Sequence, residues 1–205
     1  MTVSGEAVPQ IPELQNRQSR GLEQFLEYVK DIPGLQLLDL GGANQENISF
    51  LTSLGHKLYS EDLVRALQAG NFDTENREPM HPQEIEEFLN STFDYPEDHF
   101  DGVLLWDTLE QLEPRLLGAT IERLKTIVRP GSYLLSLFHA QEKAKVVPVY
   151  SYRIYDFRTL ALTHRGWRKP LQYFNNRGLE KLFQDFESVK FFLSRDNLRD
   201  VIVRR

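Results

Sequence analysis

The chain has 205 residues, 40% of them hydrophobic, and a formal net charge of −6 at pH 7. This length is most simply one domain, and the acidic balance makes a nucleic-acid partner unlikely, because general phosphate-backbone binders normally show a basic face. The sequence contains no cysteine, which excludes disulfides and thiolate metal sites, and its five histidines show no metal-ligand spacing, so we expect no metal.

The sequence predicts neither a membrane-spanning segment nor a signal peptide. No apolar run approaches the roughly 20 residues of a membrane span, and the first residues lack the basic and apolar segments of a signal peptide. We therefore expect a cytoplasmic protein with no membrane partner. Residues 1–14 contain two prolines and little periodicity, which predicts a flexible arm before a single domain over residues 15–205.

Helices and strands are expected to alternate from the start of that domain. Apolar residues recur at three- and four-residue spacing between Leu22 and Val29, which predicts an amphipathic helix over residues 15–30. The apolar run at residues 35–40 predicts a strand buried on both faces. The next expected elements are a helix over residues 44–54, a strand over 57–60 and a short helix over 63–69.

Residues 70–99 are the least legible part of the chain, with three prolines. Only a helix over residues 82–90 is predicted there, because proline is well tolerated in a first helical turn. Later elements show clear apolar patterns. They are a strand over residues 100–106, a helix over 114–128, a turn at 129–131, a strand over 133–138, a helix over 176–186 and two strands over 188–193 and 198–203.

This order of elements predicts an α/β fold. Alternating strands and helices favour a Rossmann-like, doubly wound, mostly parallel sheet, and the short connection between the last two strands predicts a C-terminal antiparallel hairpin. Residues 139–172 are basic and aromatic and predict no clear element. That stretch is either an insertion that covers a substrate, a nucleic-acid groove, or a partly buried flap whose aromatic side chains cover the sheet edge.

A ligand of such a sheet binds at the carboxyl ends of the strands. In the loop after the first strand, Gly41 and Gly42 let the backbone turn tightly and approach a ligand. The helix behind them begins near Asn47 with free amide groups that suit a carboxylate or a phosphate. Asp62 ends the second strand about 20 positions after Gly41, a spacing at which a carboxylate accepts hydrogen bonds from ribose hydroxyls. The sequence therefore predicts a nucleoside-containing cofactor.

The charges of this loop favour a cationic nucleoside. A dinucleotide fingerprint would need glycines where the chain has Ala43 and Glu46, and Glu46 would oppose a pyrophosphate. An NAD-linked oxidoreductase is therefore disfavoured. S-adenosylmethionine carries a sulfonium and an ammonium cation but no phosphate, and a crevice with Asp39, Asp62 and Asp107 tolerates such cations better.

Four segments in the same order and spacing resemble the class I S-adenosylmethionine-dependent methyltransferase superfamily, over residues 35–138. LLDLGGANQENISFL resembles motif I, GHKLYSEDL the second motif, FDGVLLWDTLEQL the fourth-strand motif, and RLKTIVRPGSYLLSLF the turn before strand five. The segment LRDVIVRR resembles the seventh strand of this superfamily. The segments WDTLEQL and SEDL resemble one of its bacterial branches. The departures are Ala43 and Gln45 for motif I glycines, Gln111 for a frequent His, and Ser132 for a turn glycine.

The resemblance implies a seven-stranded sheet, S-adenosylmethionine as cofactor, S-adenosylhomocysteine as product, and methyl transfer to an unknown small-molecule or protein acceptor. It places the backbone of the glycine turn near the methionine part of the cofactor, two asparagines on its carboxylate, an aspartate on the ribose and a leucine on the adenine. The implied cofactor-binding residues are Asp39, Gly41, Gly42, Ala43, Asn44, Asn47, Asp62, Leu63 and Trp106.

The resemblance also implies a catalytic position. Trp106 and Asp107 would lie near the transferring methyl, and Asp107 is the candidate base or substrate-orienting group. Other interpretations stay open: Asp62 and Asp107 as helix caps, and Trp106 as plain core. The altered loop GGANQ favours a competing hypothesis, a non-catalytic binding or regulatory module that keeps the fold. The sequence predicts neither the acceptor nor the oligomeric state.

Overall fold

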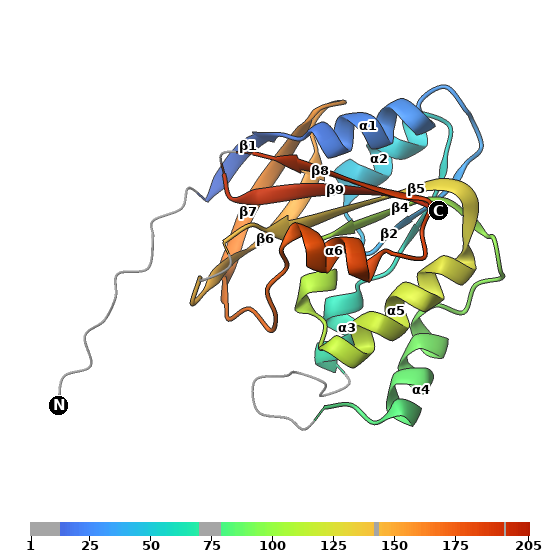
Figure 1. Ribbon diagram of the computed structural model, residues 1–205. Coiled ribbons are helices and arrows are strands. Elements are labelled where there is room, and N and C mark those ends of the chain that lie inside the picture. Colours follow the sequence, from blue (N-terminus) through green and yellow to red (C-terminus); the bar gives the residue numbers. More distant parts are fainter. Residues whose placement is uncertain (1–12, 70–78, 142–143, 195) are drawn as a thin grey trace.

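The computed structural model describes residues 13–69, 79–141, 144–194 and 196–205, and these form two sheets and the helices around them (Figure 1). None of the helices in these ranges is both long and apolar enough to cross a membrane. The described elements are β1 (Leu14–Gln18), α1 (Arg20–Val29), β2 (Gln36–Asp39), α2 (Gln45–Ser53), β3 (Lys57–Ser60), α3 (Leu63–Ala69), α4 (Pro82–Thr92), β4 (Phe100–Trp106), the 3₁₀ turn η1 (Leu109–Gln111), α5 (Pro114–Ile127), β5 (Val128–His139), β6 (Val147–Ile154), β7 (Thr159–Arg168), α6 (Asn176–Leu182), β8 (Ser188–Leu193) and β9 (Leu198–Arg204).

The larger sheet has the strand order β3-β2-β4-β5-β9-β8. Its first four strands are parallel, and β9 pairs antiparallel with both β5 and β8. The predicted doubly wound sheet and C-terminal hairpin are therefore confirmed. The count differs from the implied seven: six strands lie in this sheet among the described residues, because the described chain between β3 and β4 supplies α3 and α4 but no strand.

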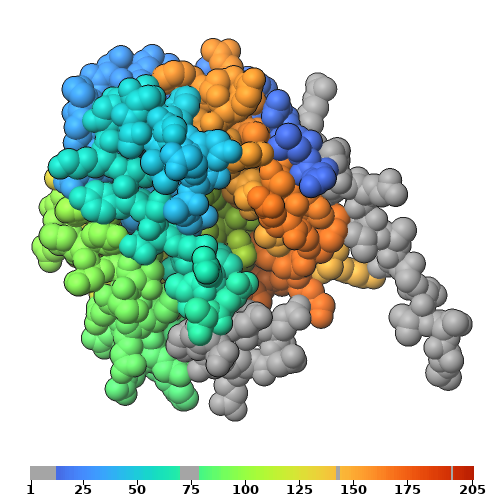
Figure 2. Space-filling model, turned by 180° about the vertical axis from the view of Figure 1, so that it is seen from behind, coloured from blue at the N-terminus to red at the C-terminus, as the bar shows by residue number. Residues whose placement is uncertain are grey.

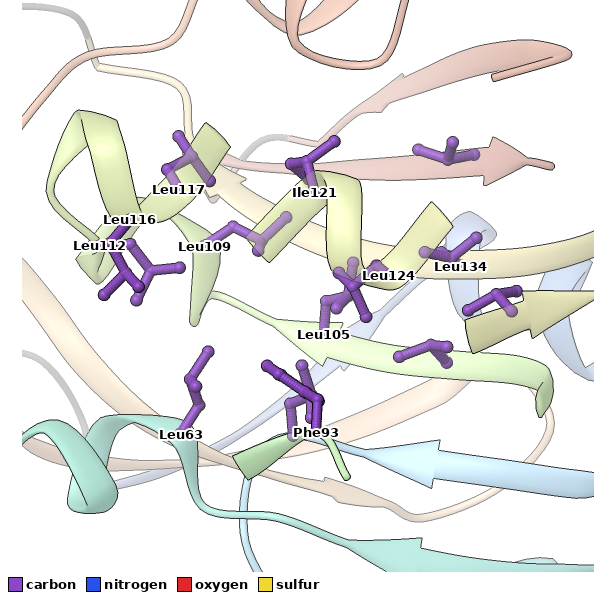
Figure 3. Packing of buried hydrophobic residues seen from close by; sticks show 14 of the residues in the cluster. Leu63, Phe93, Leu105, Leu109, Leu112, Leu116, Leu117, Ile121, Leu124 and Leu134 are labelled. Atoms are coloured by element: carbon purple, nitrogen blue, oxygen red, sulfur yellow. The ribbon is translucent and has the colours of Figure 1, made fainter. Parts of the chain in front are cut away.

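Helices cover both faces of this sheet, α1 and α2 on one side and α3 to α6 on the other (Figure 1). Strand β4 is buried at every position, as expected of a parallel strand between two helical layers. Figure 3 shows the second face, where α5 residues pack against β4 and β5. The labelled residues of that packing are Leu63, Phe93, Leu105, Leu109, Leu112, Leu116, Leu117, Ile121, Leu124 and Leu134.

The N-terminal segment differs from its prediction. Residues 14–18 form strand β1, which pairs antiparallel with β7, and the helix starts only at Arg20. The cause is Ser19, whose extended backbone ends the strand and whose hydroxyl accepts a hydrogen bond from Leu22 N at 3.0 Å, an N-cap contact. Leu14 therefore belongs to a strand, and the rest of the expected arm, residues 1–12, lies outside the described residues.

The stretch without predicted elements, residues 139–172, contains the antiparallel hairpin of β6 and β7. With β1 it makes a second sheet of order β1-β7-β6. Its buried side chains, Tyr152, Ile154, Leu160 and Leu162, join the core on the α1 and α2 side. The hairpin therefore packs firmly on the domain, as the flap interpretation requires.

Three boundaries also differ. Strand β5 begins at Val128, so the residues expected to form a turn at 129–131 belong to this strand. The strand is irregular there, because its pairing with β4 shifts register between Phe100 and Gly102. Helix α6 ends at Leu182 rather than 186, and α4 extends to Thr92. Such shifts are usual where tertiary pairing decides an end.

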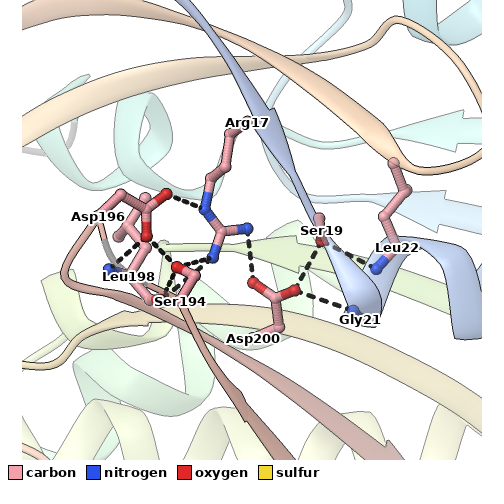
Figure 4. Close-up of polar contacts among 8 residues, drawn as sticks. All are labelled: Arg17, Ser19, Gly21, Leu22, Ser194, Asp196, Leu198 and Asp200. Atoms are coloured by element: carbon pink, nitrogen blue, oxygen red, sulfur yellow. Dashed lines mark hydrogen bonds and ion pairs between the residues drawn. The ribbon is translucent and has the colours of Figure 1, made fainter.

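Arg17 fastens β1 to the larger sheet (Figure 4). Its guanidinium lies 2.6 Å from Asp200 on β9 and 2.5 Å from Asp196, and only 4% of the Arg17 side chain and 2% of the Asp200 side chain are exposed. The other oxygen of Asp200 accepts hydrogen bonds from the Ser19 hydroxyl and the Gly21 amide at 2.8 and 2.9 Å. One buried carboxylate thus holds the end of β1 and the start of α1.

We predict that Arg17→Met lowers the free energy of unfolding by about 3–5 kcal/mol, because it leaves the Asp200 carboxylate buried without its cation. Urea denaturation measures the loss. Arg158→Ala is the control, since its 3.4 Å pair with Glu23 is exposed and should contribute about 0–1 kcal/mol. Equal small losses for both variants would contradict the importance of the Arg17 contact.

Candidate functional site at the carboxyl ends of β2 and β4

A cavity of about 320 Å³ opens where β2 and β4 end, between the main sheet and the β6–β7 hairpin. In Figure 2 a hollow lies between the cyan surface, formed by residues that follow β2 in the sequence, and the orange surface of β6 and β7. The strand order changes direction between β2 and β4, and such a switch point is where doubly wound sheets bind ligands. Most of the sequence-predicted residues line this cavity: Gly41, Gly42, Ala43, Asn44, Asn47, Asp62, Trp106 and Asp107.

Asp39 does not line the cavity but holds its wall together. One carboxylate oxygen accepts hydrogen bonds from Gly41 N at 2.9 Å and from the indole N–H of Trp106 at 2.6 Å, and the other accepts from the Asn47 amide at 3.3 Å. Burial raises the pKa of Asp39 above its ordinary value, although these donors oppose the shift. Asp39 therefore supports the residues that line the cavity, and its expected contact with a cofactor stays a prediction.

The two asparagines expected to donate to a carboxylate have internal partners. Asn44 caps α2, because its side-chain oxygen accepts from Glu46 N and Asn47 N at 3.0 and 3.1 Å. The Asn47 amide donates to Tyr152 O at 3.2 Å, and its oxygen accepts from Ile154 N at 2.8 Å. The start of α2 is thus already capped, and Asn47 ties that helix to β6.

The glycine turn passes close to two site residues. A Cβ atom on Gly41 would lie 2.5 Å from the Trp106 ring, and one on Gly42 would lie 2.9 Å from an Asp62 oxygen. Gly42 also has a φ of 82°, which side-chain-bearing residues rarely adopt. Glycine is therefore needed at both positions, as the sequence pattern indicated.

Asp62 combines the two roles that the sequence left open. One of its oxygens accepts from Arg65 N at 2.9 Å at the start of α3, while the exposed side chain lines the cavity. Its neighbour Glu61 accepts from the Tyr95 hydroxyl at 2.5 Å instead. Asp62 can therefore cap the helix with one oxygen and receive a ligand hydroxyl with the other.

Leu63 is a correction. It was expected on an adenine ring, but it is fully buried in the core against the α5 side (Figure 3). The reason is that α3 starts at this residue and directs its first apolar side chain inward. Val64, one position later, lines the cavity instead.

Trp106 forms a wall of the cavity, and both its backbone and its ring are constrained. Its φ is 49°, an uncommon conformation for a bulky residue, and its ring lies parallel to that of Tyr152 with centroids 5.4 Å apart. Residues held in such conformations cluster at functional sites. The contacts to Asp39 and Tyr152 hold this conformation in place.

Asp107 brings a buried carboxylate to the cavity. One oxygen accepts from the Gln111 amide at 3.3 Å, and the other has no hydrogen-bond partner among the described residues. Burial, and then the nearby Glu110 carboxylate, raise the pKa of Asp107 to about 6, while Arg168 and His139 act in the opposite direction. A partly protonated carboxyl with a free oxygen suits proton transfer or the orientation of a ligand.

The hairpin supplies a wall that the sequence patterns did not predict. Tyr150, Ser151 and Tyr152 on β6 and Arg165 on β7 line the cavity opposite the glycine turn. Arg165 is exposed, and its Nε donates to the Ser151 hydroxyl at 3.1 Å. The basic and aromatic composition of residues 139–172 was the available signal, but it did not reveal which side chains face inward.

Comparison with known proteins was consistent across sequence and structure. The family described as "Methyltransferase domain" matches residues 13–187, whereas no curated protein matches the chain. An S-adenosylmethionine-dependent methyltransferase from Archaeoglobus fulgidus is similar at a TM-score of 0.53 and 15% identity, covering 90% of this chain and 91% of the other. A putative type 11 methyltransferase from Sulfolobus solfataricus has a TM-score of 0.51 and 16% identity, covering 92% and 94%. At these identities the solved structures show a shared fold.

We predict that Asp107→Asn stabilises the protein at alkaline pH. Because the folded-state pKa of about 6 lies above the ordinary aspartate value of 3.8, the wild type loses stability as pH rises from about 4 through about 6. The asparagine variant avoids that loss, about 2–3 kcal/mol at pH values above about 7.

Urea denaturation at several pH values measures this difference, which should shrink toward about pH 4. Asp94→Asn is the control, because Asp94 is exposed and a surface substitution there should change the free energy of unfolding by about 0.5 kcal/mol at most. A constant difference between wild type and Asp107→Asn over the whole range would rule out a raised pKa.

Proposed function

The chain belongs to the methyltransferase-domain family, and on that premise we propose that it transfers the methyl group of S-adenosylmethionine, bound in the cavity at the ends of β2 and β4, to an acceptor. The observation that carries this proposal is the convergence of the glycine turn, Asp62 and Asp107 on one cavity. S-adenosylmethionine, when bound, supplies a methyl group on a positively charged sulfur that a nucleophile can attack.

The donor set fits this cofactor. The carboxylate of Asp107 on the cavity wall suits the positive charge of the cofactor, and the exposed Asp62 oxygen suits a ribose hydroxyl. Arg165 is the cation on the cavity wall and is our candidate for the cofactor's carboxylate in place of Asn47, whose amide already donates to Asp39 and Tyr152. The backbone of Gly41 and Gly42, with Ala43, would face the methionine part.

Trp106 and Val64 supply the apolar part of the site. Val64 replaces Leu63 as the candidate contact for the adenine ring, because it is the α3 side chain that lines the cavity. The Trp106 ring is fixed by Asp39 and Tyr152 and would limit where the reactive end of the cofactor can lie. Positioning of this kind can contribute on the order of 7–11 kcal/mol to catalysis.

Asp107 is the candidate catalytic residue. With a pKa of about 6, most Asp107 side chains are carboxylates at neutral pH and can accept a proton or hydrogen bond from an acceptor. Its contact with Gln111 leaves one oxygen free for that purpose. Asp107 would orient the reactive end of the acceptor.

The competing hypothesis of a non-catalytic module was based on the altered glycine motif, in which Gln45 replaces a glycine. The Gln45 amide donates to Ser49 along the exposed face of α2 at 3.2 Å, and Gln45 is not among the residues that line the cavity. The substitution therefore leaves the proposed cofactor site open, which favours the enzyme over the module.

Calorimetric titration with S-adenosylmethionine and S-adenosylhomocysteine tests the proposal directly. A ligand that binds only the folded state raises the free energy of unfolding by about 2.7 kcal/mol at a hundredfold excess over its dissociation constant. No heat of binding and no such stabilisation with either compound would contradict the proposed function and favour the non-catalytic module.

We predict that Asp62→Asn weakens S-adenosylhomocysteine binding by about tenfold to a hundredfold, because the charged acceptor for the ribose is lost while asparagine still caps α3. Calorimetry measures the dissociation constant. Glu61→Ala is the matched control, since Glu61 contacts Tyr95 outside the cavity. Equal affinities for wild type and Asp62→Asn would place the ribose elsewhere.

A further inference from the structure

A second cavity, also about 320 Å³, lies on the other side of Tyr150 from the first. Tyr150 lines both cavities. The second one opens at the carboxyl end of β5, the next parallel strand after β4, where His139 lines it. Both cavities therefore lie at the edge where doubly wound sheets bind ligands.

A buried acid and a histidine adjoin this second cavity. The Glu110 carboxylate accepts from His139 N at 2.9 Å, and its other oxygen contacts both His139 Nδ1 and the Arg168 guanidinium. The side chains of His139 and Glu110 are 8% and 6% exposed. The Nδ1 atom of His139 faces this carboxylate, and in the tautomer that carries its proton on Nδ1 the Nε2 atom is an acceptor.

Nothing in the described residues satisfies that acceptor. His139 Nε2 is buried and has no hydrogen-bond partner there. A nitrogen oriented by a carboxylate and free on its other side is the usual arrangement of a general base. Buried polar atoms normally have hydrogen-bond partners, so a ligand in the cavity with an N–H or O–H group would supply the partner that Nε2 lacks.

The remaining walls indicate what kind of ligand fits. Trp167 and Tyr150 offer aromatic faces, and Gln15 and Gln141 offer hydrogen bonds. Aromatic rings favour offset or edge contacts with other rings. The Asp196 carboxylate on the wall is paired with Arg17, and Glu110 with Arg168, so no unpaired charge of these residues calls for an ionic ligand.

We propose that this second cavity binds the methyl acceptor, an uncharged aromatic compound with an ionisable hydroxyl or ring N–H, and that His139 Nε2 accepts its proton. This inference rests on the proposed function. On transfer, the acceptor's oxygen or nitrogen bonds to the methyl carbon, the sulfur–methyl bond breaks with its electron pair left on sulfur, and the acceptor's proton goes to His139. Tyr150 would separate the body of the acceptor from the cofactor.

The test uses 4-nitrophenol as probe and 4-nitroanisole, its methyl ether, as the matched ligand without a hydroxyl. Equilibrium dialysis of the full chain with S-adenosylhomocysteine present measures both affinities, and the visible absorbance of nitrophenolate shows whether the bound phenol loses its proton. We expect 4-nitrophenol to bind at least about tenfold more tightly, because only its hydroxyl satisfies His139. Equal affinities would overturn the role of His139.

Two variants locate the binding site. His139→Gln removes the proton acceptor, and Gln141→Trp fills the cavity while leaving Glu110 and Arg168 untouched. Each should weaken 4-nitrophenol binding by about tenfold or more and leave S-adenosylhomocysteine affinity unchanged. Arg115→Ala, on the exposed side of α5, is the control and should change neither affinity.

The two readouts separate this inference from the proposed function. Binding of S-adenosylhomocysteine without binding of 4-nitrophenol, or 4-nitrophenol binding that neither variant weakens, would overturn the second cavity as an acceptor site while the methyltransferase proposal stands. Binding of 4-nitrophenol at the second cavity without any binding of S-adenosylhomocysteine would instead remove the acceptor role together with the proposed function.

Discussion

The buried carboxylate of Asp39 is the constraint on which the site depends. Its two oxygens contact the glycine turn, the Trp106 indole and the Asn47 amide, and Asn47 in turn bonds to the β6 backbone on both sides of its amide. One side chain therefore sets the positions of the turn after β2, the end of β4, the start of α2 and the hairpin. Because buried polar networks are costly when incomplete, loss of any of these contacts would loosen all four parts together.

The predictable part of the molecule is the part governed by local pattern. The apolar runs of β2 and β4 and the glycines after β2 depend on neighbouring residues, so the sequence predicted the strands and the loop that line the first cavity. Asp62 and Asp107 follow strand ends, and their place at the same edge follows from parallel topology. The role of Asp39 could not be predicted, because its partner Trp106 lies 67 residues away on β4 and the Asn47 side chain is also held by β6.

The unpredicted part depends on pairing across long sequence distances. Residues 15–18 were predicted as the start of the helix although the apolar spacing begins only at Leu22, whereas their pairing with β7 and the Arg17 contact with Asp200 make them part of strand β1. The β6 and β7 strands show the same effect: their inward side chains depend on a register that shifts between Val149 and Tyr150. Val64 rather than Leu63 lines the first cavity, because α3 begins at Leu63 and directs that side chain into the core.

The division of the walls decides which parts of the site substitutions can change. The turn after β2 and the end of β4 belong to the main sheet, whose residues are fixed by the core, whereas the opposite wall belongs to an added hairpin with exposed residues such as Arg165. Substitutions on that hairpin can therefore reshape both cavities, including the Arg165 position proposed for the cofactor's carboxylate, while the glycine turn and the end of β4 keep their contacts to the core.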